Sequence, residues 1–158
     1  MEIRDHIGRI IPFDFNRDYP DLIEIEIQRF DQPMTRMLLS FLRKRYGDEF
    51  WYALDATGNQ QIDAYLIAGP EQQEDMEVIH IYSIAVRKEL EGKGWAYKLM
   101  QHLIAKARNA GKAAIILEVR DNNPHAYQFY QKLGFEVTGT EKNYYEQGVD
   151  AIKMSYFL

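Results

Sequence analysis

The chain has 158 residues, of which 46 % are hydrophobic and 27 % are charged, and its formal net charge is −5. This balance predicts one globular domain over residues 1–158 with a substantial core, and it argues against nucleic acid as a general partner. The absence of cysteine excludes a disulfide framework and a covalent thiol mechanism. No secretory segment opens the chain and no run approaches the ~20 apolar residues of a membrane span, so we expect a cytoplasmic protein with no membrane partner.

The first half of the chain predicts a strand, two helices and a hairpin. The strand is expected over Arg9–Phe15 and the second helix over Met34–Tyr46. The first helix is indicated by an apolar stripe at helical spacing, formed by Tyr19, Leu22, Ile23, Ile27 and Phe30. Phe50–Leu54 and Ile62–Ala68 are typical of hairpin strands, and the acidic stretch Gly69–Asp75 of a solvated loop.

The middle of the chain joins a strand, Val78–Val86, to a glycine turn and a helix. The turn consists of Gly92, Lys93, Gly94, Trp95, Ala96 and Tyr97. Glycines let the backbone approach an anion, and the first N–H groups of a helix have no intrahelical partners, so this turn predicts a phosphate cradle. It is not a P-loop, because Gly94 follows Gly-Lys where Ser or Thr is needed, and Tyr97 is too large for the dinucleotide fingerprint. A purely structural glycine turn remains the alternative.

Two more elements follow the cradle helix, whose apolar stripe runs from Ala96 to Ala107. Lys112–Arg120 predicts a strand with Ile115, Leu117 and Val119 on one face. After it, Asn123 can cap a helix that has Pro124 at its first position and Gly134 as a left-handed stop. Short strands at Phe135–Val137 and Val149–Met154 would close the sheet.

These motifs, taken in order, resemble the GNAT superfamily of acetyl-CoA-dependent N-acetyltransferases. The resemblance rests on Leu117-Glu118-Val119-Arg120, Asn123, Phe129-Tyr130-Gln131-Lys132-Leu133-Gly134-Phe135, Asn143-Tyr144-Tyr145 and Asp150-Ala151-Ile152-Lys153-Met154. Within the superfamily the chain is most similar to the branch that acetylates protein N-termini, including the ribosomal-protein alanine acetyltransferases. The strong resemblance covers about Val78–Met154, half of the chain.

The resemblance implies an α/β fold, a mixed and mostly antiparallel twisted sheet with helices on both faces. Acetyl-CoA, without a metal, would lie in the cleft where the parallel strands around Val86 and Leu117 splay apart. The cofactor would be held by the backbone of Ile84, Ala85 and Val86, by the cradle Gly92–Tyr97, and by Asn123 and Tyr130. One departure is Glu91, which stands where the superfamily has Arg or Gln. A carboxylate repels a diphosphate, so its side chain must point away or be offset by Lys93, Lys98 and Arg87.

Attack of an amine on a thioester needs a base, because a free α-amino group has a pKa of about 7.7–8.0 and arrives largely protonated. The family's base matches Glu118; taken alone, Glu118 would be an exposed strand residue paired with Arg120. The family's general acid matches Tyr130, which also lies on the apolar face of its helix and can serve as packing. His80 matches a histidine that assists proton removal in archaeal relatives; otherwise it is a structural strand histidine.

The resemblance also implies where the acceptor binds and what it is. Phe30 and Asp31 lie where the family has its substrate loop, and Tyr144 and Tyr145 match an aromatic pair beside the substrate backbone, although two strand tyrosines can equally form an edge cluster. The implied activity is direct acetylation of a protein or peptide N-terminal α-amino group by a monomer or homodimer. Acetylation of a small amine or a lysine, and a non-catalytic acyl-CoA-binding module suggested by Glu91, remain alternatives.

Overall fold

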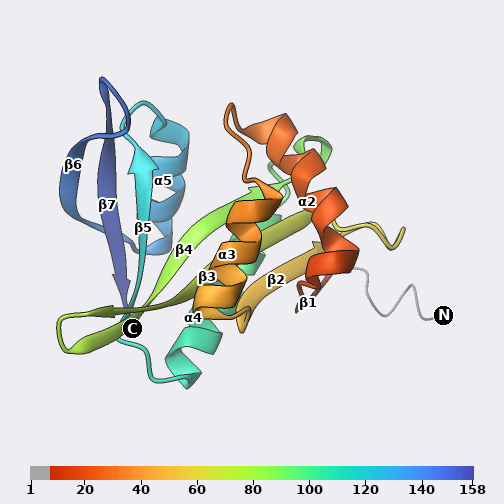
Figure 1. Cartoon of the computed structure of the whole chain (residues 1–158), viewed down its shortest axis with the longest axis horizontal. Helices are drawn as coiled ribbons and strands as arrows, with labels where there is room; N and C mark the ends of the chain where they lie inside the picture. Colours follow the sequence, from red (N-terminus) through yellow and green to blue (C-terminus); the bar gives the residue numbers. More distant parts are fainter. Residues whose placement is uncertain (1–7) are drawn as a thin grey trace. The chain divides into compact units, whose positions relative to one another are not determined.

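The computed structural model describes residues 8–158 (Figure 1). Its elements are, in chain order, β1 (Arg9–Pro12), α2 (Phe15–Arg29), α3 (Arg36–Tyr46), β2 (Phe50–Asp55), β3 (Ala64–Gln73), β4 (Met76–Val86), the short 3-10 helix η1 (Lys88–Leu90), α4 (Trp95–Asn109), β5 (Ala114–Arg120), α5 (Pro124–Leu133), β6 (Glu136–Glu146) and β7 (Val149–Phe157). Within residues 8–158 no helix has the length and apolar character needed to cross a membrane.

The strands form a seven-stranded sheet in the order β1-β2-β3-β4-β5-β7-β6. Neighbours pair antiparallel at β1–β2, β2–β3, β5–β7 and β6–β7. β4 and β5 form a parallel pair in which Ile79 lies opposite Ile115 and His80 opposite Ile116. The predicted mixed, mostly antiparallel sheet with a parallel strand pair is therefore confirmed.

The chain divides into two compact units. The first contains the residues up to Gly69 together with Ile81–Lys106, and the second contains Pro70–His80 and Ala107–Leu158. β4 contributes its first five residues to the second unit and its last six to the first. The predicted cradle thus belongs to the first unit and the predicted base to the second.

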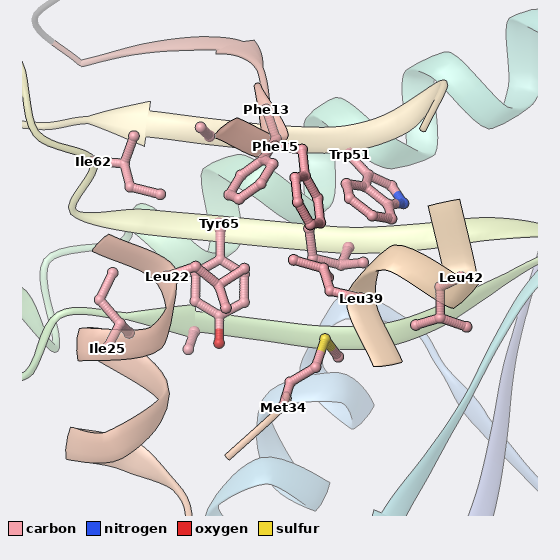
Figure 2. Packing of buried hydrophobic residues seen from close by; sticks show 13 residues of the cluster. Phe13, Phe15, Leu22, Ile25, Met34, Leu39, Leu42, Trp51, Ile62 and Tyr65 are labelled. Carbon is pink, nitrogen blue, oxygen red and sulfur yellow. The ribbon is translucent and has the colours of Figure 1, made fainter. Parts of the chain in front are cut away.

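The core of the first unit lies between its strands and the helices α2 and α3 (Figure 2). Side chains alternate along a strand, so Trp51 and Ala53 of β2 and Tyr65 and Ile67 of β3 share the face that these helices cover. The opposite face carries α4, because Tyr52 contacts His102 edge-on with 4.6 Å between ring centroids. Helices therefore cover both faces of this part of the sheet.

The helix α4 confirms the stripe predicted from the sequence. Leu99, Met100, Leu103, Ile104 and Ala107 are all buried. Their spacing of three and four residues places them on one side of the helix, and this side packs inward. Ala96, at the start of the stripe, is only partly buried.

The second unit packs α5 against the sheet through aromatic rings. The ring of Tyr130 lies 5.5 Å from that of Phe135, which in turn lies 5.5 Å from Tyr156. As predicted, Asn123 caps α5 by accepting a hydrogen bond from the backbone N–H of Ala126 at 3.1 Å, and Gly134 ends it in the left-handed conformation with φ of 109°. Both ends of this helix were therefore readable from the sequence.

The predicted stripe of the first helix is partly wrong. The side chain of Ile27 is 66 % exposed, whereas Ile25 and Glu26 are buried. Glu26 accepts hydrogen bonds from the backbone N–H of Met34 at 2.7 Å and from the hydroxyls of Ser83 and Tyr65. These donors satisfy a carboxylate that the hydrophobic pattern assigned to the solvent side.

Several strand boundaries also differ from the prediction, most of all at β6, which runs over Glu136–Glu146 where a short strand at Phe135–Val137 was expected. β1 ends at Pro12, because Asp14 caps α2 by accepting from the backbone N–H of Arg17 at 2.9 Å. The stretch Gly69–Asp75 is not a loop, since β3 continues to Gln73 and β4 begins at Met76. Polar residues on a strand with one exposed side resemble a loop in composition, and this explains the error.

Candidate active site

Glu118 lies at the centre of a polar cluster in the second unit. The hydrophobic face of β5 is buried, and Glu118 occupies the alternate face, where its side chain is 15 % exposed. Its Oε1 lies 2.8 Å from Nε2 of His80 and accepts a hydrogen bond from the hydroxyl of Tyr144 at 3.4 Å. The cluster thus brings together three residues that the sequence assigned separately to base, proton assistance and substrate contact.

His80 lies between two carboxylates. While Nε2 faces Glu118, Nδ1 lies 3.2 Å from Oε2 of Glu71. Burial alone would lower the pKa of the imidazole, but the hydrogen bond and charge of Glu118 and the charge of Glu71 outweigh it and raise that pKa above its ordinary value. Glu71 was not among the site residues predicted from the sequence, because it was assigned to a solvated loop. Only recognition that β3 continues to Gln73 could have placed Glu71 beside His80.

Arg120, the alternative partner expected for Glu118, contacts other residues instead. Arg120 forms an ion pair with Glu146 at 3.0 Å, and its guanidinium lies 4.4 Å from the ring centroid of Tyr145. Burial and the nearby charge of Glu118 raise the pKa of Tyr145 to about 12. Tyr144 and Tyr145 contact each other edge-on, with ring centroids 4.9 Å apart.

A pocket of about 370 Å³ opens beside this cluster, entirely within the second unit. It is lined by Glu71, Gln73, His80, Ile116, Leu117, Glu118, Thr138, Glu141, Tyr144, Lys153, Met154 and Ser155. Lys153 pairs with Glu141 at 3.5 Å, and His80 lies between Glu71 and Glu118, so three carboxylates face two basic groups and the negative groups are in excess. The pocket is suited to a cationic group such as an ammonium.

Tyr130 is buried in α5, with rings of Phe129 and Phe135 around it. Burial raises the pKa of its phenol well above the ordinary value, and the neighbouring Tyr145 adds to the shift. The packing role expected for Tyr130 is therefore fulfilled.

The predicted cradle lies in the first unit, between η1 and α4. Gly92 and Gly94 have φ of 78° and 86°, values that L side chains rarely adopt, and nothing lies within 4 Å of a Cβ built on either. The first hydrogen bond of α4 runs from the N–H of Lys98 to the carbonyl of Gly94 at 3.0 Å. The backbone N–H groups of Trp95, Ala96 and Tyr97 come before this bond and have no acceptor within the helix. The turn thus offers donors of the kind that bind a diphosphate.

The charge of Glu91 is offset by Arg29, the last residue of α2. Two nitrogens of its guanidinium each lie 3.0 Å from a carboxylate oxygen of Glu91, a bidentate pair. The expected partner Arg87 instead pairs with Glu24 at 2.7 Å, and Lys98 contacts the carbonyl of Gly8. Because 62 residues separate Arg29 from Glu91, no local pattern could have predicted this pair.

The remaining predicted residues fall in the first unit. Phe30 terminates α2 and is 41 % exposed, and the exposed Asp31 follows it. In the last stretch of β4, Ala85 belongs to the buried core, while Ile84 and Val86 are half-buried. The structure therefore brings His80, Glu118, Tyr144 and Tyr145 together in one unit, and Ile84–Val86, the cradle, Phe30 and Asp31 belong to the other.

The chain is similar in sequence to known acetyltransferases. A sequence model of the acetyltransferase (GNAT) family matches residues 13–135. An uncharacterized N-acetyltransferase of Methanocaldococcus jannaschii is 31 % identical over 140 residues, which cover 88 % of this chain and 85 % of that protein. The ribosomal protein bS18-alanine N-acetyltransferase of Haemophilus ducreyi is 30 % identical over 140 residues, 88 % of each chain.

Solved structures agree. The crystal structure of the ribosomal-protein-S18-alanine N-acetyltransferase from Escherichia coli has a TM-score of 0.81 and 26 % identity, covering 96 % of this chain and 94 % of that one. Ard1 from Thermoplasma volcanium has a TM-score of 0.84 at 22 % identity, covering 96 % and 97 %, and supports the fold alone. By its sequence and its fold, the chain belongs to the GNAT family of acetyltransferases.

Proposed function

We propose that this acetyltransferase transfers the acetyl group of acetyl-CoA directly to the α-amino group of a protein or peptide N-terminus. The observation that carries the proposal is the contact of Glu118 with His80 at 2.8 Å and with Tyr144 at 3.4 Å, beside a pocket with three carboxylates. The similarity to bS18-alanine N-acetyltransferases supports this class of acceptor. The family match runs through residues of both units, which supports our inference that residues 1–158 act as one acetyltransferase domain. An acceptor of this class would be met in the cytoplasm.

Acetyl-CoA fits the donors that the first unit offers. The backbone N–H groups of Gly92–Tyr97 would hold the diphosphate, and the backbone of Ile84–Val86 would pair with the pantetheine arm. Two solved structures of similar fold contain CoA, and this supports the ligand. When bound, it supplies an acetyl thioester, which is activated toward an amine.

Side chains of the second unit would remove a proton from the acceptor amine and donate a proton to the leaving thiol. The carboxylate of Glu118 would accept a proton from the acceptor ammonium, and His80 and Tyr144 would fix the orientation of that carboxylate through its Oε1. The hydroxyl of Tyr130 would hold the proton needed by the leaving thiol. The side-chain oxygen of Asn123 accepts the hydrogen bond that caps α5. Its amide N–H groups would then be the donors that contact the cofactor.

The carboxylates of the pocket also suit a lysine side chain or a small polyamine, so this acceptor class is the second candidate. The non-catalytic alternative rested on Glu91, and the pairing of Glu91 with Arg29 removes that support.

A turnover assay with acetyl-CoA separates the candidates. The panel would contain peptides with free N-termini, the same peptides with a blocked N-terminus and one lysine, and polyamines. We expect transfer to the free N-termini and at least tenfold lower kcat/KM for the blocked peptides. Preference for blocked peptides or polyamines would establish the second candidate, and no transfer to any amine would overturn both.

A further inference from the structure

Glu71 makes the second contact of His80, and nothing in the proposed reaction uses it. It lies on β3 with its side chain 37 % exposed, and its Oε2 is 3.2 Å from Nδ1 of His80. The contact lies within the second unit, in the pocket that Glu118 also lines. It therefore joins a half-buried carboxylate to the proposed base through one imidazole ring.

The hydrogen bond at Nε2 and the negative charge beside Nδ1 together determine how the ring is protonated. An ionised carboxylate only accepts hydrogen bonds, and a neutral imidazole has one N–H and one bare lone pair. A neutral ring that donates from Nε2 to Glu118 carries no charge opposite the carboxylate of Glu71, whose contact at Nδ1 is an ion pair rather than a hydrogen bond. The imidazolium donates from Nε2 to Glu118 and places its positive charge between the two carboxylates, so it is the form that both favour.

We propose that Glu71 is a positioning residue for acetyl transfer: it holds His80 as an imidazolium that donates through Nε2 to Oε1 of Glu118. This inference rests on the proposed function of Glu118 as the base. Tyr144 donates to the same Oε1. Among the contacts of the described residues both donors fall on Oε1, so Oε2 is the oxygen left for the acceptor amine.

The other charged groups of the pocket do not replace Glu71. Glu141 is engaged by Lys153 at 3.5 Å, and Tyr144 is a neutral donor whose pKa is raised by burial and by Glu118. Glu71 from β3 and Glu118 from β5 both face His80, and both carry negative charge. Removing Glu71 therefore removes a charge that favours the imidazolium.

The direct test is a titration of His80 by ¹H–¹⁵N NMR in the wild type and in Glu71→Gln, with the signal assigned from His80→Gln. We expect the wild-type midpoint above the ordinary value of about 6.5 and the variant midpoint lower by about 1 unit or more, the usual effect of a close opposite charge. Glu141→Gln is the matched control, since it removes a carboxylate of the same pocket and should leave the midpoint in place. A wild-type midpoint at or below the ordinary value, or no shift in Glu71→Gln, would overturn the proposal.

The kinetic test separates positioning from a merely structural role. At low pH His80 is charged in both proteins, so kcat/KM for the acceptor should be similar. As pH rises, the variant loses the imidazolium first, and its kcat/KM should fall to about one tenth of the wild-type value above both midpoints for a one-unit shift. Glu71→Asp should lie between the two. A constant ratio across pH would contradict the positioning role.

The NMR result does not depend on turnover. If the wild type acetylates no amine, the proposed function fails, but the titration still shows whether Glu71 keeps His80 protonated. If the wild type is active but the midpoint does not move, the function stands and the role of Glu71 is refuted.

Discussion

The cradle and the acid–base cluster are built in different ways. Gly92–Tyr97 is a single stretch of chain whose donors are backbone N–H groups, and its conformation depends on two glycines with positive φ. The cluster takes its side chains from β3, β4, β5 and β6, and its geometry exists only after these strands have paired. A backbone site can therefore be recognised in a short sequence, whereas a side-chain site must be assembled by the fold.

The largest expected effect is at Glu118. Glu118→Gln keeps the shape and the contacts of the side chain but cannot accept a proton, so the chemical step should slow by about 10²–10⁴ with acetyl-CoA affinity unchanged. The loss should shrink as pH rises and free amine becomes abundant. Single-turnover rates from pH 6 to 9 measure this, and wild-type rates throughout would refute the role of base.

Tyr130→Phe should cost about as much in rate, again in the range of about 10²–10⁴, because it deletes only the proton donor. The ring contacts with Phe129 and Phe135 are retained, so the melting temperature should change little. In contrast to Glu118→Gln, the loss should not shrink with pH. An unimpaired rate would leave Tyr130 as packing alone.

Gly94→Pro tests the cradle, because proline fixes φ near −65° and removes an N–H. We expect calorimetry to detect no acetyl-CoA binding by a folded variant. Gly94→Ala and Gly148→Ala form a matched pair, since both glycines have φ of 86° and open space at Cβ. Both should lose about 1–2 kcal/mol of stability, but only Gly94→Ala should also weaken binding. Equal affinities in the pair would mean that the turn is purely structural.

The smallest expected effect is at the ion pair beside the cradle. Arg29→Gln removes the guanidinium that pairs with Glu91 and should weaken acetyl-CoA binding by roughly 1 kcal/mol, more at low ionic strength. In Arg29→Gln/Glu91→Gln the affinity should return close to the wild-type value. If the single variant binds normally at low salt, Glu91 does not influence the ligand.

The sequence predicted what depends on local pattern. The caps of α5 at Asn123 and Gly134 and the stripe of α4 follow from residue type and spacing, and all are confirmed. The contacts of Glu26, Glu71 and Arg29 were not predictable, because each joins residues of different elements. In each case a charged residue that composition assigns to solvent is satisfied by a partner that only the fold supplies. The assigned roles of Glu118, Tyr130 and the cradle remain predictions until the variants are measured.

The hairpin of β3 and β4 carries both Glu71 and His80, which are only nine positions apart in the chain. Their contact depends on the turn at Glu74 and Asp75, where Glu74 has φ of 52°. Inserting one residue into either strand would turn every side chain beyond it to the other face, whereas inserting two would restore the facing. Among natural variants of this protein, length changes in the hairpin should therefore come in even numbers within the strands. Such a pattern of insertions and deletions would record selection on which face of the hairpin each side chain occupies.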